Sequence, residues 1–309
     1  MRMNALFRRA VLRLSERKLI ESLFRKHGMR IGVSRFVAAE TLVDVLGKIK
    51  EMNGQGLAVT LDYLGESVLD PALAEEAALQ IIAMLRTIHD NGLQANVSVK
   101  LTQLGCRIDP AVSMKHMERI VGAAKYYRNF VRIDMEDSTL TDETLRMTHA
   151  LVTRFGKQHV GTVIQAYLYR SPSDLADMGK LDANVRIVKG AYKEEATIAY
   201  PHKKEVDRQY VALVKSHMTD GHYTAIATHD PRIIEELKAF ADRRSFSKDS
   251  FEFQMLYGIA SKLQLELVKQ GYRVRVYTPF GRQWYPYFTR RIAERPANLL
   301  FVLKGMLRR

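Results

Sequence analysis

The sequence has little cysteine and no long apolar segment. A single cysteine, Cys106, occurs among 309 residues, so no disulfide can form within the chain. No apolar run approaches the ~18 residues that a transmembrane helix needs. The N-terminus also lacks the continuous apolar segment and small-residue cleavage site of a secretory signal. We therefore expect a cytoplasmic protein in a reducing compartment, with no membrane-spanning segment.

Two nucleotide-binding motifs are also missing. Residues 53–59 (NGQGLAV) contain two glycines but not the third of a GxGxxG fingerprint, and they precede an apolar run instead of following one. No GK[ST] phosphate loop occurs. A nicotinamide cofactor on a Rossmann domain and ATP chemistry are both disfavoured.

What the chain has in excess is positive charge, with a formal net charge of +14 and a pI near 9.8. Such a charge attracts nucleic acid, anionic lipid and acidic ligands alike. Because no known nucleic-acid motif is present, a nucleic-acid partner is not expected. Residues 1–35 interleave basic and apolar residues at helical spacing, and we predict a basic helical segment there. It either lies on a membrane surface or covers part of the core, and the second reading is favoured.

The remainder, residues 36–309, contains eight short β-branched or apolar runs separated by amphipathic helical segments. This is the pattern of βα units around a parallel sheet. A repeat of roughly 20 to 40 residues favours a closed (β/α)8 barrel of the TIM type over an open sheet, and no linker divides the chain. The predicted strands are residues 56–61, 94–99, 130–133, 160–166, 185–188, 223–227, 251–255 and 272–277.

Each of these runs ends in polar or ionisable residues. In a parallel barrel the carboxyl ends of all strands open on one face, where barrel enzymes place their chemistry. The sequence therefore predicts a polar pocket at this face. The polar strand ends are Asp62 with Glu66, Lys100, Asp134 with Glu136 and Asp137, Gln165, Arg186 with Lys189, Thr228 with His229, Gln254, and Tyr277.

Residues 277–298 (YTPFGRQWYPYFTRRIAERPAN) read as a strand end, a turn and a helix stopped by Pro296. On that helix Tyr287, Arg290, Arg291 and Glu294 fall at i, i+3, i+4 and i+7, along one face. Two adjacent arginines at the mouth of a barrel could bind a carboxylate or phosphate in a bidentate manner. A solvated Arg–Glu surface pair explains the spacing equally well.

Taken singly, other residues leave the chemistry open. A lone lysine at a strand end, Lys100, would suit a Schiff-base aldolase if burial among cations lowered its pKa. His229 alone is most often structural. Asp134, Glu136 and Asp137 could hold a hard metal ion, but no compact ligand pattern accompanies them, so no metal is expected.

The sequence of residues 277–298 resembles the last strand and helix of the proline dehydrogenase family. Further matches follow in the family's order: RFVAAETLVDVL, VTLDYLGESV, SVKLTQLG, RIDMEDS, TVIQAYLYRS, VRIVKGAY, IATHDP and FEFQMLYG. The resemblance is to the monofunctional bacterial type. It implies a distorted (β/α)8 barrel that holds FAD over its strand ends and oxidises L-proline to Δ1-pyrroline-5-carboxylate by hydride transfer to flavin N5, the first step of proline catabolism to glutamate.

The resemblance assigns the substrate side of this site. Arg290 and Arg291, joined by Lys100, would pair with the proline carboxylate. Tyr277, Tyr287 and Leu256 would form the wall around the pyrrolidine ring, and Asp134 would support the ion network beneath it. Glu66 would pair with Arg290 and close over bound substrate, and Glu294 completes the arginine face of the helix.

It also assigns the flavin side. Arg186 would place its charge near N5, and Gln165 would hydrogen-bond the ring. Lys189, Gly190, Ala191 and Tyr192 would approach the cofactor, since glycine lets a backbone come close to a ligand. Thr228 and His229 would reach the ribityl and phosphate groups. Lys203 or Lys204 would meet the adenine half.

Reduced flavin must pass its electrons on, and the family implies a quinone-type acceptor. A basic amphipathic N-terminus could then hold the enzyme peripherally on the inner face of the cytoplasmic membrane. The sequence leaves open the choice between proline and close analogues such as hydroxyproline.

Overall fold

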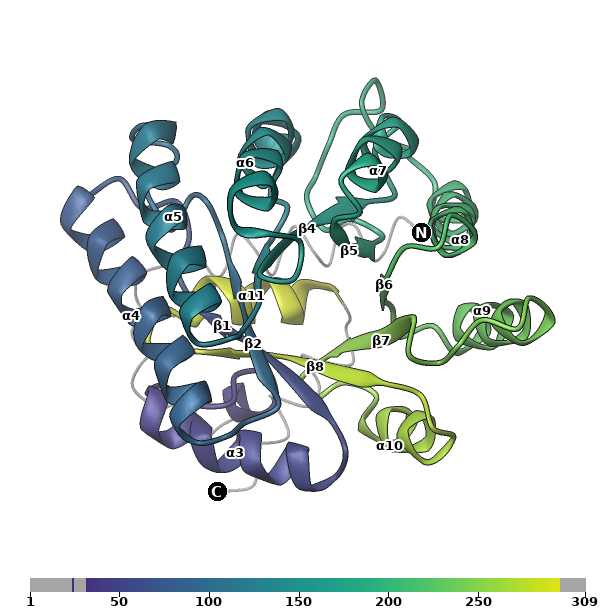
Figure 1. The fold of residues 1–309 in the computed structure, drawn as a ribbon, viewed down its shortest axis with the longest axis horizontal. Coiled ribbons are helices and arrows are strands. Elements are labelled where there is room, and N and C mark those ends of the chain that lie inside the picture. The colour runs from purple at the N-terminus through teal and green to yellow at the C-terminus, as the bar shows by residue number, and fades with distance from the viewer. Residues whose placement is uncertain (1–23, 25–31, 295–309) are drawn as a thin grey trace.

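The computed structural model describes Phe24 and residues 32–294. Eight parallel strands form a closed barrel in the order β1 to β8, with β8 paired to β1 (Figure 1). The predicted barrel is confirmed. The strands are β1 Ala58–Tyr63, β2 Ala95–Val99, β3 Val131–Ile133, β4 Val160–Gln165, β5 Asn184–Val188, β6 Thr224–Ala227, β7 Phe251–Leu256 and β8 Val274–Phe280.

All eight predicted strands exist, and most boundaries agree within two residues. The largest difference is at β8, which continues to Phe280 beyond the predicted end at Tyr277. The longer strand arises because its last residues pair with β1 as far as Tyr63. Tyr277 therefore lies within β8, facing the barrel axis, and not at the last position of the strand.

Helices surround the barrel on its outside (Figure 1). Three of them begin with the same signal, an aspartate cap followed by proline at the first helical position. Asp70, Asp109 and Asp230 each accept a hydrogen bond from the main-chain N–H two residues later. The helical elements are η1 Val33–Arg35, α3 Leu42–Gly54, α4 Pro71–Asp90, α5 Pro110–Tyr126, η2 Ser138–Leu140, α6 Thr141–Phe155, α7 Ser171–Lys180, α8 Lys203–Thr219, α9 Pro231–Arg243, α10 Ser261–Lys269 and α11 Tyr285–Glu294.

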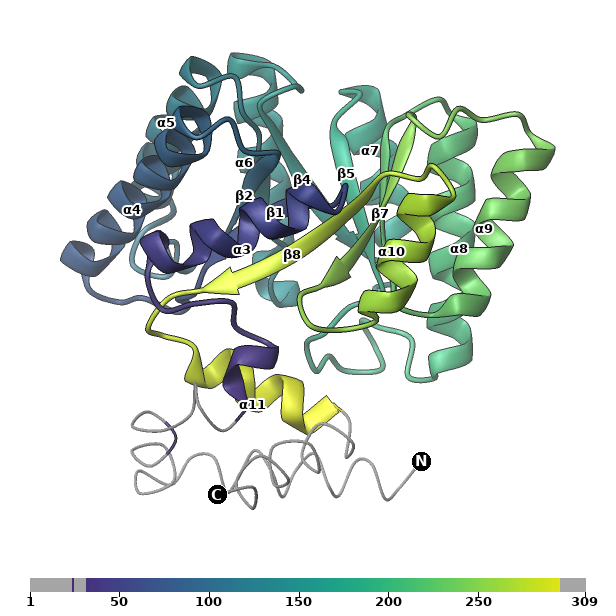
Figure 2. The same cartoon turned by 90° about the horizontal axis from the view of Figure 1, so that it is seen from below.

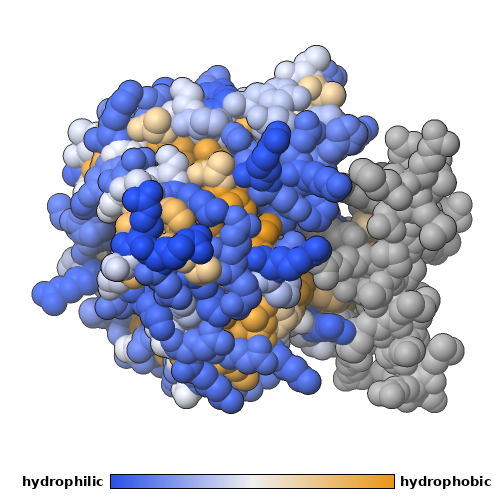
Figure 3. Space-filling view, turned by 90° about the vertical axis from the view of Figure 1, so that its right-hand side faces the viewer, coloured by the Kyte–Doolittle hydropathy of each residue, from blue (hydrophilic) through white to orange (hydrophobic). Residues whose placement is uncertain are grey.

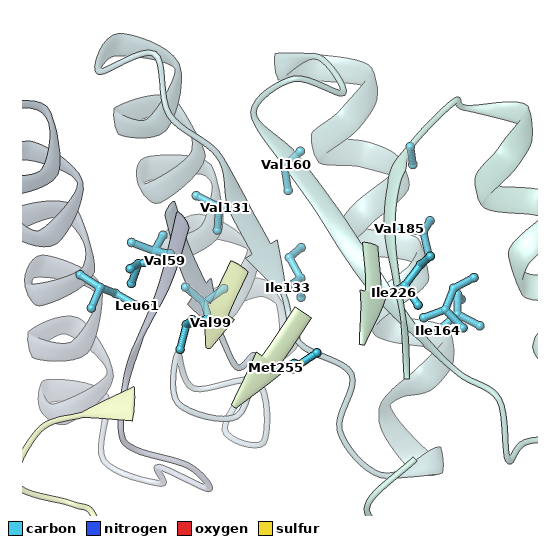
Figure 4. Packing of buried hydrophobic residues seen from close by; sticks show 14 of the residues in the cluster. Val59, Leu61, Val99, Val131, Ile133, Val160, Ile164, Val185, Ile226 and Met255 are labelled. Atoms are coloured by element: carbon cyan, nitrogen blue, oxygen red, sulfur yellow. The ribbon is translucent and has the colours of Figure 1, made fainter. Parts of the chain in front are cut away.

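The two faces of the strands carry different side chains. Alternate residues point toward the helices and are aliphatic, as Figure 4 shows for Val59, Val131, Ile133 and Val185. Each such side chain contributes roughly 1.5–3 kcal/mol through burial. The residues between them point to the barrel axis and are mostly polar. These axial residues include Thr60, Asp62, Asn96, Ser98, Arg132, Asp134, Arg186, Glu252, Gln254, Arg275 and Tyr277.

The last described helix, α11, lies beyond the carboxyl end of β8 and not beside the barrel wall (Figure 2). It is anchored by a second apolar cluster in which Phe288 contacts Phe36, with ring centroids 6.2 Å apart. Trp284 donates a hydrogen bond from Nε1 to Glu40 at 2.9 Å. The sequence just before α3 therefore fixes the helix that carries the predicted arginines.

The predicted basic segment at residues 1–35 lies mostly outside the described residues, as does Pro296. Phe24 packs on Phe288 at a centroid distance of 5.6 Å. On the side of α8, α9 and α10 the described surface is largely hydrophilic (Figure 3). Among the described residues, no helix combines the length and apolar character needed to cross a bilayer.

Candidate active site

Charged and hydroxyl side chains from five strands meet inside the carboxyl end of the barrel. Asp134, the residue that follows β3, lies at the centre. Its Oδ1 accepts from Arg186 Nη1 at 2.8 Å and from Ser98 Oγ at 3.0 Å, and its Oδ2 accepts from Tyr277 OH at 2.7 Å. Lys100 Nζ lies 3.6 Å from the same Oδ2 and 3.2 Å from Asp62 Oδ1. The strand ends that the sequence placed on one face are thus in direct contact.

The surroundings of Asp134 keep it ionised. Burial alone would raise the pKa of this carboxyl, but the charges of Arg186 and Lys100 outweigh burial. Hydrogen bonds from Tyr277 and Ser98 act in the same direction, so the pKa lies below its ordinary value. Asp62 is shifted the other way, because burial raises the pKa of its carboxyl more than the charge of Lys100 lowers it. The two acids, Asp62 and Asp134, face two cations, Lys100 and Arg186.

Lys100 is held as an ammonium group. Burial would lower its pKa, but the carboxylates of Asp62 and Asp134 raise it well above the ordinary value of a lysine. A Schiff-base role would require neighbouring cations or desolvation to lower the pKa of the lysine. Lys100 is instead surrounded by acidic groups that raise it. The aldolase alternative loses its support.

Tyr277 is a neutral hydroxyl donor. Burial, followed by the charges of Asp134 and Asp62, raises the pKa of this phenol well above 10. Its ring also lies under the guanidinium of Arg186, with Cζ 5.2 Å from the ring centroid. One residue thus fixes both the carboxylate and the arginine.

A cavity of about 580 Å³ opens between the β1–α4 loop and α11. Its lining includes Glu66, Lys100, Tyr287 and Arg290, so the predicted lysine and the helix arginine share one space. Arg290 Nη1 forms an ion pair with Glu66 Oε1, the partner that the resemblance implied. Arg291 packs its guanidinium over the ring of Tyr287, 5.3 Å from the centroid. The cavity therefore lies directly over the ion network.

Two further predicted residues border this region. Leu256, the last residue of β7, is half-buried, and its main-chain N–H donates to Nε2 of His229 at 2.9 Å. His229 thus has a direct contact with the strand end. Glu294 is the last residue of α11, and its side chain lies outside the described part of the structure.

The acidic trio after β3 is divided among three partners. Asp134 binds Arg186, Glu136 accepts from Thr102 Oγ1 at 2.5 Å, and Asp137 pairs with Arg107 at 2.5 Å. Within residues 32–294, no group of three or more His, Cys, Asp or Glu side chains is placed to hold a metal ion. The trio is used for internal ion pairs and hydrogen bonds.

The residues predicted on the flavin side follow β4, β5 and β6. Gln165 donates from Nε2 to the main-chain carbonyl of Glu136 at 2.8 Å. No described protein group donates to its Oε1. Gly190 has φ of +110°, and a Cβ there would come within 2.2 Å of the Tyr167 ring. Glycine is therefore required by contact with Tyr167 as well as by its backbone conformation.

Two lysines meet two aspartates beside this region. Lys189 Nζ lies 2.5 Å from Asp207 Oδ1 and 3.9 Å from Asp230 Oδ2, and Lys203 pairs with the same Asp207. Lys204 is exposed and makes no ion pair with any residue the structure describes. The geometry thus brings Lys203, and not Lys204, together with Lys189.

The other predicted flavin-side residues differ in burial, and Thr228 is the buried one among them. Thr228 accepts at Oγ1 from the main-chain N–H of Asp230 at 3.1 Å. Ala191 is exposed and Tyr192 is half-buried. Burial raises the pKa of Tyr192 and the charge of Glu136 adds to it, so this residue is a neutral phenol.

Three residues of the network were recognised only as polar strand positions or not at all. Asp62 and Gln254 were read as strand ends without a role, and Ser98 was not singled out. The signal that identifies them is strict alternation with aliphatic residues, as in Val97-Ser98-Val99 and Phe253-Gln254-Met255.

A second cavity, of about 690 Å³, lies at the opposite, amino-terminal end of the barrel. Helix-to-strand loops line it, with Asn129, Arg273 and Arg275 among its residues. It is the larger of the two, but it is separated from the predicted site by the length of the strands.

Comparison with known proteins gives a consistent result. The family model described as proline dehydrogenase matches residues 45–304. Proline dehydrogenase of Deinococcus radiodurans is 45% identical over 308 residues, covering 99% of each chain. Proline dehydrogenase 2 of Bacillus subtilis is 41% identical over 296 residues, covering 96% of this chain and 97% of the relative.

A solved structure agrees on the fold. The crystal structure of proline utilization A (PutA) from Bdellovibrio bacteriovorus, inactivated by N-propargylglycine, superposes with a TM-score of 0.81 at 24% identity. The match covers 89% of this chain and 33% of that protein. At 24% sequence identity, this structural similarity supports the barrel fold alone.

Proposed function

We propose that this chain, which belongs to the proline dehydrogenase family, oxidises L-proline to Δ1-pyrroline-5-carboxylate with FAD as its cofactor. The observation that carries the proposal is the neutralised ion network of Asp62, Lys100, Asp134 and Arg186 beneath a cavity that Arg290 borders. Such a site binds a small zwitterion through its carboxylate and leaves the ring against neutral side chains.

Cationic groups bind the carboxylate of proline in this proposal. Lys100 and Arg290 line the same cavity, and Arg291 follows Arg290 on α11. Charge-assisted hydrogen bonds of this kind are shorter and stronger than neutral ones. Because Lys100 stays protonated between two carboxylates, its positive charge is available at any pH near neutrality.

Neutral side chains position the pyrrolidine ring. Tyr277, Tyr287 and Leu256 come from β8, α11 and β7, so three elements form the wall. Tyr287 is buried in the cluster that anchors α11 and stacks with Arg291. The ring wall and the carboxylate clamp are therefore built as one unit.

The residues present fit FAD. Gln165 offers an acceptor, Oε1, to which no described group donates, and Arg186 offers a buried cation beside it on the next strand. Lys189 and Lys203 provide two cations for phosphate groups, with Thr228 and His229 adjacent on the next strand end. When bound, the flavin supplies the two-electron oxidant and accepts a hydride at N5.

Arg186 supplies the electrostatic part of the reaction. With FAD held over these strand ends, a fixed cation at this position would favour negative charge on the flavin. Its guanidinium is only 6% exposed and is held by Asp134 and Ser98. Because these contacts exist before the substrate binds, no reorganisation is needed during reaction.

Glu66 and Arg290 control access. Their ion pair links the β1–α4 loop to α11 across the mouth of the cavity. When the substrate carboxylate engages Arg290, the pair covers the bound ring and excludes water from it.

The decisive test is a visible absorption spectrum of the purified protein, taken before and after adding L-proline without oxygen. Flavin bands that bleach on addition are the expected result. A colourless protein that also fails to bind added FAD would contradict the cofactor, and bands that ignore proline would redirect the substrate to other cyclic amines. A parallel titration with hydroxyproline ranks the two analogues.

We further propose that electrons pass to a quinone-type acceptor and that the protein works in the cytoplasm, peripherally on the inner face of its membrane. The motivation is the excess of basic residues near the N-terminus. Liposome flotation of the full chain and of a chain lacking the residues before Arg30 tests this. Equal binding by both proteins would remove the role of that segment.

A further inference from the structure

The interior of the barrel contains a continuous line of polar contacts that extends below the candidate site. Arg186 Nε donates to Gln254 Oε1 at 2.5 Å. Gln254 Nε2 in turn donates to Glu252 Oε1 at 2.5 Å, and Arg275 Nε donates to the same oxygen at 2.8 Å. The line therefore connects Arg186 to a buried ion pair near the amino-terminal end of the barrel.

The orientation of the Gln254 amide is determined by its two neighbours. Arginine has only donors, so the amide oxygen must face Arg186. An ionised glutamate has only acceptors, so the amide nitrogen must face Glu252. Gln254 is 4% exposed, so water does not compete for either contact.

Glu252 is ionised in this setting. Burial would raise the pKa of its carboxyl, but the charge of Arg275 and hydrogen bonds from Arg275 and Gln254 lower it below the ordinary value. Arg275 is itself fixed by a hydrogen bond from Nη1 to the main-chain carbonyl of Val59 at 2.9 Å. The end of the line remote from the site is thus anchored to β1.

Each nitrogen of the Arg186 guanidinium is engaged by a different residue. Nη1 contacts Asp134, Nη2 contacts Ser98 at 3.2 Å, and Nε contacts Gln254. Asp134 and Ser98 also belong to the network that contacts Lys100 and Tyr277. Of the three residues that contact the guanidinium, only Gln254 lies outside that network. It therefore fixes the orientation of the guanidinium independently of Asp134 and Ser98.

We propose that Gln254, oriented by Glu252, is a positioning residue for Arg186 and thereby tunes the reduction potential of the bound flavin. This inference rests on the proposed flavin function. Gln254 does not line the substrate cavity, so its effect is expected on electron transfer and not on binding of proline.

The test compares Gln254→Met with Gln264→Met in the FAD-loaded full chain. Gln264 of α10 is an equally buried glutamine, but its Nε2 donates only to the main-chain carbonyls of Leu256 and Ile259. Both variants lose a buried amide of the same size. Only Gln254→Met removes a contact of Arg186.

We expect Gln254→Met to shift the flavin midpoint potential about 30 mV more negative, the two-electron equivalent of a tenfold change. The kcat for proline should fall about tenfold with KM unchanged within about twofold, because a hydrogen bond to a charged group is lost. Gln264→Met should lower the melting temperature but leave the potential unchanged.

An unchanged potential and kcat in Gln254→Met, in a wild-type background that binds flavin and turns over proline, would overturn the inference alone. Equal potential shifts in both variants would also overturn it, because the effect would then be general loss of packing. If Gln254→Met does not fold, Gln254→Asn is measured instead. Its amide is too short to span Arg186 and Glu252, so the same shift is expected. A wild-type protein without flavin would instead contradict the proposed function.

Discussion

The outward and inward faces of the barrel strands differ in chemistry although their residues alternate along the same chain. Outward residues such as Val131 and Ile133 are fully buried aliphatic side chains packed against the helices. The residue between them, Arg132, and the next one, Asp134, point to the axis and are charged. In many TIM barrels the axis is filled with branched apolar residues, whereas here it contains linked ions. The outward face of each strand therefore stabilises the fold, and the inward face provides the charged groups of the site.

The largest effect is expected from Asp134→Asn, which tests the inward face. The change keeps the shape of the side chain but leaves Lys100 and Arg186 with one buried carboxylate fewer. Breaking a buried pair costs about 3–5 kcal/mol. An equal loss in the stabilisation of the transition state would lower kcat/KM for proline on the order of a thousandfold. Steady-state kinetics with an artificial acceptor measures it. A loss below about tenfold would mean that the network is structural only.

Ile133→Ala is the matched test of the outward face, one residue away. The side chain is fully buried in the main core, so its truncation should lower the free energy of unfolding by about 2–4 kcal/mol. Denaturant unfolding gives this value, and kcat/KM of the folded fraction should stay within about threefold. A large loss of activity in the folded protein would break the division between the two faces.

Protonation of His217 should also act on stability and not on the reaction. This α8 residue lies outside the barrel, where Nδ1 bonds Thr224 Oγ1 at 2.9 Å and Nε2 is buried without a hydrogen-bond partner among the described residues. Burial, with a smaller contribution from the charge of His222, lowers its pKa to about 4.

The sign of the effect follows from that shift. Between pH 6.5 and about 4 the unfolded chain binds a proton that the folded protein does not, so stability falls as the pH is lowered through this window. The expected loss is about 2–4 kcal/mol, measured by urea unfolding at several pH values. The slope should flatten in His217→Gln. An equally steep slope in that variant would assign the effect to other groups.

The smallest of these effects is expected at the mouth of the site. Arg290→Met removes one charged contact to the substrate carboxylate and the ion pair with Glu66. KM for proline should rise on the order of tenfold to a hundredfold, with a smaller change in kcat. Arg282→Met serves as a control, since that exposed arginine does not line the cavity. An unchanged KM would exclude Arg290 from substrate binding.

Strand positions and the face of the barrel that bears the polar residues were predictable from the sequence. Apolar runs such as Val185–Val188 and Phe251–Met255 identify strands, and parallel strands necessarily present their ends on one face. The pairing of Glu66 with Arg290 came from the family resemblance, because the two residues are 224 positions apart.

Other features depended on three-dimensional contacts that spacing does not reveal. The sign of the Lys100 pKa shift required knowing that Asp62 and Asp134 flank it. The requirement for Gly190 reflects the Tyr167 ring, which approaches from another strand end. The polar line through Gln254 was visible as an alternating pattern in β7, but its partners on β5 and β8 could not be read from that pattern.

The anchoring of α11 has a consequence for how the protein is made. Phe36 and Phe288 are 252 positions apart, and β1 must pair with β8 to close the barrel. During synthesis on the ribosome, β1 can therefore pair with β8 only after nearly the whole chain has been made. Proteins that depend on such non-local pairing fold slowly, because the entropy of loop closure is lost before the stabilising contacts form. Nascent chains shorter than about 290 residues would expose the edge of β1 that pairs with β8, which makes this step a target for chaperones.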